Sequence, residues 1–358
     1  MHEAPYIRLV AAPFSKDEEA KWSEFIHQQP NGNFFQSPGF VSLYKDCRNY
    51  QPLILFAENS NGELTGVLIA IMITDQFYGI PFPRILIQGG PVIAKSLPNH
   101  SEVLRALLKF LKLRIPRKTV FLEIRNLHQW GEEAAIFQEL GFVWHDHLND
   151  IVPIHLKNQV ISSIKPTKQR QIRRGLENGA IIRPAASVGE VEDFFRLLSD
   201  LYKKTIRKPI PPLKFFINFF QQMQPENKGV ILIISYKEQV IGGMVCPFSG
   251  RHTVHEWYIC SVHDKLKHLY PGVLATWAGI DFAIVNKFHY FDFMGIGSPQ
   301  KPYGVRTFKT KFGGEIINFG RWQLIHNKFR YNLGVFGYNL LKIRIKFALL
   351  LDFFALSI

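Results

Sequence analysis

Apolar residues recur in short, regular patterns along both halves of the chain. Alternating or continuous apolar runs predict strands at 6–10, 52–58, 63–74, 84–87 and 119–124, and again at 230–236, 240–248, 253–260, 290–294 and 316–324. Apolar residues at helical spacing predict helices over 15–27, 101–113, 132–140, 166–178, 187–204, 212–223 and 271–286. The Asn61-Gly62 pair between two strand-like runs is typical of a hairpin.

The two halves repeat one order of elements. Each contains helices, an antiparallel meander, a helix, a strand, a short helix and a final strand, which indicates internal duplication. This combination predicts an α/β (α+β) fold with mixed sheets flanked by helices. We place the boundary between Pro153 and Pro166, which gives an N-terminal domain over 1–157 and a C-terminal domain over 158–327.

The tail at 328–358 differs from both halves. It is rich in apolar residues and carries Lys342, Arg344 and Lys346 in its middle, which argues against a transmembrane span. The pattern predicts a basic amphipathic helix. Two interpretations stay open at this point: the helix lies in a membrane interface, or it docks on the protein core.

Composition adds information about compartment and partners. The 358 residues include 47% hydrophobic and 20% charged residues, which is typical of a globular protein, and the formal net charge is +14. A basic protein attracts nucleic acid, anionic lipid or phosphorylated small molecules. Cys47, Cys246 and Cys260 do not have the spacing of a disulfide framework or a zinc site, and residues 1–5 do not resemble a secretory signal. We therefore expect a cytoplasmic protein, with peripheral membrane contact left open by the tail.

Four stretches resemble the Fem family of peptidoglycan-bridge aminoacyltransferases, which is part of the GNAT-like acyltransferase superfamily. Residues 33–37 are similar to the family's opening motif, 168–179 to the basic helix that opens its second domain, and 201–207 to a later segment of that domain. The most specific signature is an aspartate strand, a glycine and a Phe-Lys pair ahead of Phe-Gly. It is found here at Asp292, Gly295, Phe308-Lys309 and Phe312-Gly313.

The resemblance implies two tandem GNAT-like domains and transfer of an amino acid from aminoacyl-tRNA onto the amine of a cell-wall precursor. Some members carry a helical-hairpin insertion associated with tRNA handling, and no such segment is visible here. The acyl donor is therefore left open between aminoacyl-tRNA and acyl-CoA. The expected acceptor is a nucleotide- or lipid-linked sugar precursor. We predict no bound cofactor and no metal, since His255, His263 and His268 are too loosely placed for zinc ligands.

Two residues are candidates for the chemistry. Acyl transfer passes through an oxyanion, which a fixed cation can stabilise. The resemblance makes Lys309 the candidate for that cation, because the Phe-Lys pair faces the active site in the family. Asp292 is the candidate for orienting a base or the amine. Each also has a structural interpretation, as a solvated helix lysine or a buried strand-end carboxylate, and no general base is identified.

Four further residues are candidates for substrate binding. Arg207 occupies a position where the family has an arginine, and a guanidinium can bind a pyrophosphate in bidentate fashion. Lys45 is a candidate for similar work from the first domain. Tyr258 lies on a strand predicted to face the active site, and Phe308 belongs to the Phe-Lys signature. The structural alternatives are surface cations for Arg207 and Lys45 and a core aromatic for Tyr258.

Two other functions remain possible from the sequence. One is an acyl-CoA-dependent N-acetyltransferase acting on a polysaccharide or sugar-lipid amine. The loop at 265–272 argues against it, since it has one glycine and Pro271 removes a backbone donor that would bind pyrophosphate. The other is a non-catalytic GNAT-like module that binds membranes.

Overall fold

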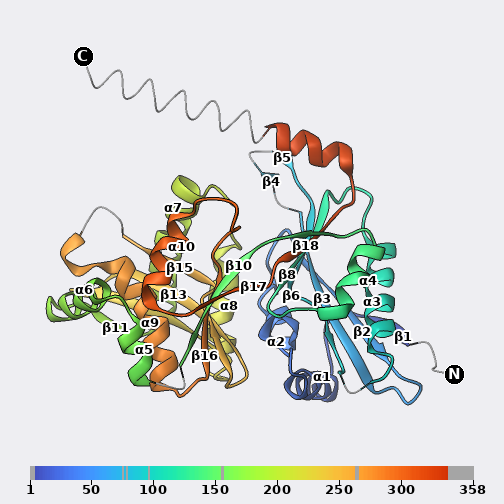
Figure 1. Cartoon of the computed structure of the whole chain (residues 1–358), viewed down its shortest axis with the longest axis horizontal. Helices are drawn as coiled ribbons and strands as arrows, with labels where there is room; N and C mark the ends of the chain where they lie inside the picture. Colours follow the sequence, from blue (N-terminus) through green and yellow to red (C-terminus); the bar gives the residue numbers. More distant parts are fainter. Residues whose placement is uncertain are drawn as a thin grey trace.

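The computed structural model describes residues 5–74, 76–77, 80–95, 97–154, 157–262 and 266–337. These residues form two mixed β-sheets, each flanked by helices, which lie side by side (Figure 1). Parallel pairs β6/β8 and β14/β16 occur within otherwise antiparallel sheets. The predicted α/β (α+β) class is confirmed.

The first sheet has the order β1-β2-β3-β6-β8-β18-β9, with β7 paired to β3. Its strands are β1 (Tyr6–Val10), β2 (Tyr50–Glu58), β3 (Leu64–Ile73), β6 (Arg84–Gly89), β7 (Val92–Ile93), β8 (Phe121–Asn126), β9 (Val143–His145) and β18 (Arg321–Ile325). Associated elements are α1 (Lys16–Gln28), η1 (Phe34–Gln36), α2 (Pro38–Ser42), the hairpin β4 (Gln76–Phe77) and β5 (Ile80–Pro81), α3 (His100–Arg114), η2 (Gly131–Glu133) and α4 (Ala134–Glu139).

The second sheet has the order β11-β12-β13-β14-β16-β10-β17, with β15 paired to β13. Its strands are β10 (Leu148–Pro153), β11 (Ile181–Pro184), β12 (Gly229–Tyr236), β13 (Gln239–Ser249), β14 (Thr253–His255), β15 (Tyr258–Ser261), β16 (Tyr290–Gly295) and β17 (Glu315–Asn318). Its helices are α5 (Lys157–Ser163), α6 (Pro166–Glu177), α7 (Val188–Leu201), η3 (Tyr202–Ile206), α8 (Leu213–Asn218), η4 (Phe219–Met223), η5 (Lys267–Leu269), α9 (Pro271–Val285), α10 (Gly304–Lys309) and η6 (Thr310–Phe312).

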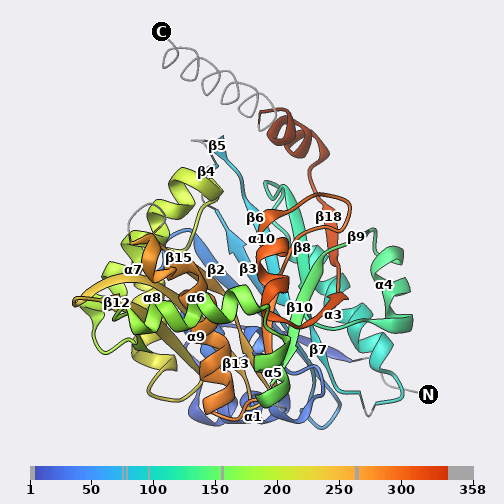
Figure 2. The ribbon, with the colours of Figure 1, turned by 60° about the vertical axis from the view of Figure 1, so that its left-hand side comes forward.

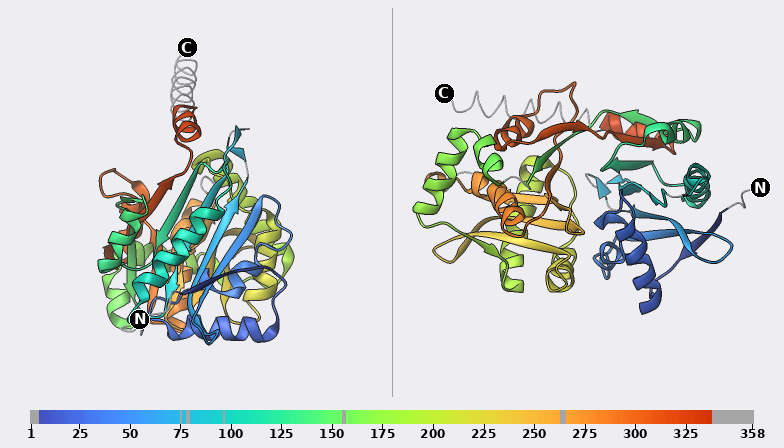
Figure 3. Two further views of the ribbon diagram at one scale, coloured as in Figure 1. Left: turned by 90° about the vertical axis from the view of Figure 1, so that its right-hand side faces the viewer. Right: turned by 60° about the horizontal axis from the view of Figure 1, so that its bottom comes forward.

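Two strands lie in the sheet of the other half of the chain. β10 precedes the predicted boundary at 157 yet pairs with β16 and β17 of the second sheet. β18 precedes the predicted boundary at 327 yet pairs with β8 and β9 of the first sheet. The two crossings, β9 to β10 and β17 to β18, connect the domains where they lie side by side (Figure 3). The sheets therefore do not follow the predicted limits, because pairing of distant strands decides which sheet a strand joins.

The predicted strand at 253–260 is interrupted in the structure. β14 pairs with β16, whereas β15 pairs with β13, and Glu256 and Trp257 lie between them. The interruption allows the Glu256 side chain to point into the protein, where it is 4% exposed. In an uninterrupted strand successive side chains point to opposite faces of the sheet, so the alternation would have fixed the face on which Glu256 lies.

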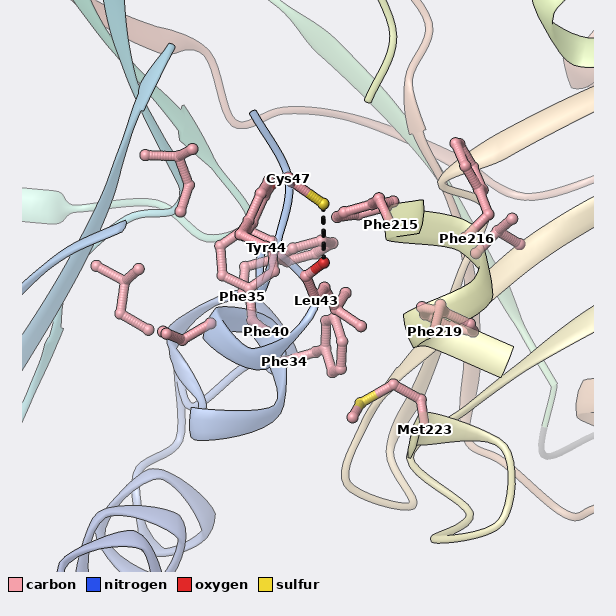
Figure 4. Close-up of a cluster of buried hydrophobic side chains, with 14 of the residues drawn as sticks. Phe34, Phe35, Phe40, Leu43, Tyr44, Cys47, Phe215, Phe216, Phe219 and Met223 are labelled. Atoms are coloured by element: carbon pink, nitrogen blue, oxygen red, sulfur yellow. Dashed lines mark hydrogen bonds between the residues drawn. The ribbon is translucent and has the colours of Figure 1, made fainter. Parts of the chain in front are cut away.

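The domains share one hydrophobic core. Aromatic residues from both sides pack together in it (Figure 4), namely Phe34, Phe35, Phe40 and Tyr44 from the first domain and Phe215, Phe216 and Phe219 from the second. Trp257 of the second domain packs against this cluster. The Phe35 and Trp257 ring centroids are 5.1 Å apart. Asn218 Nδ2 donates to the carbonyls of Leu43 and Lys45 at 3.1 and 2.9 Å. This buried contact fixes the position of one sheet against the other.

The predicted C-terminal helix is present over residues 328–337, and 338–358 lie outside the described residues. It stands above the β4–β5 hairpin at one end of the first domain in both Figure 1 and Figure 2. Among the helices described, none combines the length and apolar character that crossing a bilayer requires.

Candidate active site

A buried ion pair joins α10 to the interrupted strand. Lys309 Nζ lies 2.6 Å from Glu256 Oε1 and donates to the Phe293 carbonyl at 2.9 Å. Both side chains are buried. Burial raises the pKa of Glu256, although the Lys309 charge acts in the opposite direction. An ammonium has three donors, so one N–H of Lys309 remains for a further partner.

Asp292 lies in the same cluster and connects it to the first domain. Its Oδ1 accepts from the backbone N–H of Met294 at 2.7 Å, and Asn149 Nδ2 donates to Oδ1 at 3.2 Å. His255 Nδ1 is 3.4 Å from Asp292 Oδ2, and its Nε2 is 2.8 Å from Ser249 Oγ. That hydroxyl accepts from Phe34 N–H at 3.2 Å. Asp292 is thus held by the buried polar network, while the His255 ring connects it to the 33–37 segment.

Asp150 completes the cluster and has no hydrogen-bond partner for either carboxylate oxygen, although it is fully buried. Burial raises its pKa to about 7, with the carboxylates of Asp292 and Glu256 adding to the effect and Lys309 opposing it. We call Asp150, Glu256, Asp292, His255 and Lys309 the acidic cluster. The ion pair with Glu256 and the hydrogen bond to the Phe293 carbonyl orient the Lys309 ammonium within this cluster.

A second, cationic cluster lies on the face of the first sheet that meets the second domain. Leu122 and Ile124 of β8 are buried in the core under α3 and α4, so Glu123 and Arg125 point to the opposite face. Arg321 of β18 pairs directly with Arg125 in the sheet. Glu123 Oε1 accepts from Arg125 Nε at 2.6 Å and from Arg321 Nη1 at 3.3 Å.

The cationic cluster contains more positively charged than negatively charged side chains. Burial alone would raise the pKa of Glu123, but Arg125 and Arg321 outweigh it and lower the pKa to about 2. Burial and the two arginines also lower the pKa of Lys208. His147, whose Nε2 is 2.7 Å from Arg321 Nη2, has its pKa lowered to about 3 by burial and the Arg321 charge, and is neutral. The two guanidinium groups of Arg125 and Arg321 therefore face one carboxylate, an arrangement that attracts an anion such as a phosphate.

The two clusters lie at neighbouring points along β16. A Cβ on Gly295 would come within 2.5 Å of His147 Nε2 and 3.4 Å of Arg321 Nη2, so a side chain there would intrude on the cationic cluster. Asp292, three residues earlier on the strand, belongs to the acidic cluster. Met294, between these two residues, has a positive φ of 54°, so β16 is not regularly extended over this stretch.

The structure brings some predicted residues together and separates others. Lys309 and Asp292 meet in the acidic cluster, and their catalytic roles stay predictions. Tyr258 lies in the shared aromatic core, with its ring centroid 5.3 Å from that of Phe216, and burial raises its pKa while the Arg125 charge opposes the shift. Its side chain therefore lies between the core and the cationic cluster.

The other three predicted residues lie outside both clusters. Arg207 is exposed and adopts a left-handed conformation (φ 56°) directly before Lys208. Lys45 is exposed, and its carbonyl accepts from Asn218. Phe308 faces the basic helix α6, where Lys168 Nζ lies 4.4 Å from its ring centroid. Their substrate-binding roles stay predictions.

Sequence reasoning missed Glu256, Asp150, Arg125 and Arg321. Glu256 was visible as an acidic residue inside an apolar strand, in the sequence His255-Glu256-Trp257. Asp150 and Arg125 also interrupt apolar runs, and such interruptions are a usable signal because charges are rarely buried without a role. No local sequence pattern indicates that Arg321 lies beside Arg125, because their proximity depends on β18 joining the sheet of the first domain.

A further cationic site lies on the second domain. A cavity of about 260 Å³ between α6 and the start of α9 is lined by Thr167, Arg170, Gln171, Arg174 and Tyr270. No group of three His, Cys, Asp or Glu side chains capable of holding a metal ion occurs among the described residues.

Comparison with known proteins supports the fold. Residues 163–309 match the family described as acetyltransferase (GNAT) domain. FemX is similar in structure, with a TM-score of 0.66 and 14% identity over 91% of this chain and 99% of that one. A tandem GNAT protein from the clavulanic acid biosynthesis pathway has a TM-score of 0.56 and 10% identity over 90% of this chain and 99% of that one.

A third similar structure is the C-terminal domain of a putative lysylphosphatidylglycerol synthetase from Agrobacterium fabrum. It has a TM-score of 0.56 and 9% identity over 91% of this chain and 98% of that one. No curated protein matches the chain in sequence. At these identities the likeness concerns the fold. The resemblance seen in the sequence is thereby confirmed at that level: the chain has a tandem GNAT fold similar to that of FemX, and its residues 163–309 match the acetyltransferase (GNAT) domain family.

Proposed function

We propose that this protein is an N-acyltransferase that moves an aminoacyl or other acyl group onto an amine of a phosphorylated cell-wall or envelope precursor. The observation that carries the proposal is the occurrence of the buried Lys309–Glu256 ion pair and of a cationic cluster beside the same strand, β16, near Asp292 and Gly295 respectively. The fold and the similarity to FemX support the same class of reaction.

The proposed step forms an amide C–N bond and breaks the ester C–O or thioester C–S bond of the donor. The free N–H of Lys309 donates to the oxyanion that develops on the carbonyl. Glu256 holds the ammonium in position through the 2.6 Å ion pair. The amine proton is released to a partner at the site, and the donor's leaving group departs with the displaced electron pair. We further propose a cytoplasmic location, where both candidate donors occur and where the cysteines remain free thiols.

We assign the acceptor's phosphate to the cationic cluster. Arg321→Gln is expected to weaken binding of a UDP-linked muropeptide by about ten- to a hundredfold, because a charge-assisted hydrogen bond and a cation are lost. Calorimetric titration or a thermal-shift series measures the change. Arg196→Gln, an exposed arginine on α7, is the matched control and should bind normally. Unchanged muropeptide binding by Arg321→Gln would remove the cluster from the acceptor site.

We assign the donor's phosphate groups to the cavity beside α6, since both aminoacyl-tRNA and acyl-CoA carry phosphates. The double variant Arg170→Gln, Arg174→Gln is expected to raise KM for the donor about tenfold or more while leaving KM for the acceptor unchanged. Amide formation from each donor measures this. Activity with acetyl-CoA but not aminoacyl-tRNA would select the acyl-CoA alternative. Equal KM values in variant and parent would show that the donor binds elsewhere.

A further inference from the structure

The helix over residues 328–337 exposes an apolar face. Phe329, Leu333 and Phe336 are 78%, 54% and 62% exposed. Their spacing of four and three residues places all three on one side of the helix. An exposed aromatic and aliphatic stripe of this kind is unusual on a soluble surface and marks a site of interaction.

The opposite face of the same helix is already attached to the first domain. The Tyr331 ring lies 6.3 Å from Phe121 in an edge-to-face arrangement, and a Cβ on Gly334 would meet the Phe82 ring at 2.5 Å. Arg330 Nη1 donates to the Lys118 carbonyl at 3.4 Å. The helix is therefore anchored by one face, and its apolar stripe points away from the protein.

The two segments that carry the stripe and the start of β8 hold charges of one sign. The helix and its preceding turn (325–337) lie against the start of β8, where the N–H groups of His326 and Asn327 both donate to the Val120 carbonyl at 3.0 Å. Segments 110–121 and 325–337 contain no aspartate or glutamate, and their cations are Lys112, Arg114, Arg117, Lys118, Lys328 and Arg330. Leu113, at the end of α3, is 82% exposed among them.

We propose that this end of the first domain, formed by 110–121 and 325–337, is a docking surface for an anionic lipid bilayer. Phe329, Leu333 and Phe336 enter the interface between headgroups and acyl chains, as the apolar face of an interfacial helix does. The surrounding lysines and arginines contact the lipid phosphates. A protein partner or a second copy would bury an apolar stripe equally well, but the uniform positive charge favours a surface of phosphates. The surface does not depend on acyl transfer.

Vesicle sedimentation of the full chain tests the proposal. We expect binding to vesicles of phosphatidylglycerol mixed with phosphatidylcholine, and weaker binding to phosphatidylcholine alone. The triple variant Phe329→Ser, Leu333→Ser, Phe336→Ser should bind the anionic vesicles at least about tenfold more weakly. The control variant Ile181→Ser, Val285→Ser removes side chains that are 58% and 66% exposed on the second domain, and should bind normally.

A second variant measures the contribution of the positive charges to vesicle binding separately from that of the apolar stripe. Replacing Arg117, Lys118, Lys328 and Arg330 by glutamine should remove the preference for anionic vesicles, and added salt should weaken binding of the parent protein. Full binding by the triple serine variant would overturn the proposal, as would equal affinity for neutral vesicles. Sedimentation velocity without lipid gives the remaining outcome: self-association that the triple variant abolishes would assign the stripe to a second copy instead.

Discussion

Replacing Lys309 by methionine is expected to lower the free energy of unfolding by about 3–5 kcal/mol and to abolish acyl transfer. Methionine nearly preserves the volume of the side chain but leaves Glu256 buried without its counter-ion, 2.6 Å from the vacated ammonium position. Burial already raises the pKa of Glu256, and the loss of Lys309 will raise it further. The destabilisation should therefore be smaller at low pH, where Glu256 can take up a proton. Chemical denaturation at two pH values measures it.

The control lies two residues further along the chain. Lys311 is exposed, so Lys311→Met should leave stability and rate nearly unchanged. The double variant Lys309→Met, Glu256→Leu should recover much of the stability, since both charges are removed together, but not the activity. A stable double variant with the parental rate would show that the pair is structural. In that case Lys309 would not stabilise the oxyanion, and the proposed mechanism would have to be abandoned.

Asp150→Asn is expected to remove a pH-dependent loss of stability. The pKa of Asp150 is about 7 in the folded protein and 3.8 as a reference. The folded state binds the proton more tightly, so this residue makes the protein progressively less stable as pH rises from the reference value to about 7. Above about pH 7 this loss of folding free energy reaches its full size, on the order of 4 kcal/mol. Asparagine does not titrate, so the variant should gain stability relative to the parent as pH rises from 4 to 8.

Asp146→Asn is a comparison variant for which we expect the opposite dependence of stability on pH. Hydrogen bonds from Asn318, Trp144 and Gln300 lower its pKa, so its carboxylate favours folding at neutral pH. Asp146→Asn should therefore lose stability relative to the parent as pH rises, in the direction opposite to Asp150→Asn. If the stabilities of the parent and Asp150→Asn changed in parallel across this range, folding would not raise the pKa of Asp150, and the prediction would be wrong.

The local structure was largely predictable because short-range patterns determine it. Ser15 caps α1 by accepting from Glu18 N–H at 3.1 Å, as its spacing indicated. The apolar run at 63–74 became β3. The Fem-like signature also singled out Lys309 and Asp292, which the structure places in one cluster. The interruption between β14 and β15 was not predicted. The residues of the two segments form one strand-like run, and the segments are distinguished only by the strands with which they pair.

The amino-acid sequence by itself determined the type of most elements, the duplicated α/β organisation and the positive charge, which follow from periodicity, capping residues and composition. The GNAT-like fold was implied by the resemblance of four stretches to the Fem family. Only the tertiary structure decided the sites: the exchange of β10 and β18 brings Arg321 beside Arg125, and the break at Glu256 turns its carboxylate toward Lys309. These contacts join residues far apart along the chain. Their geometry depends on strand pairing and on the packing of one domain against the other, for which no local pattern exists.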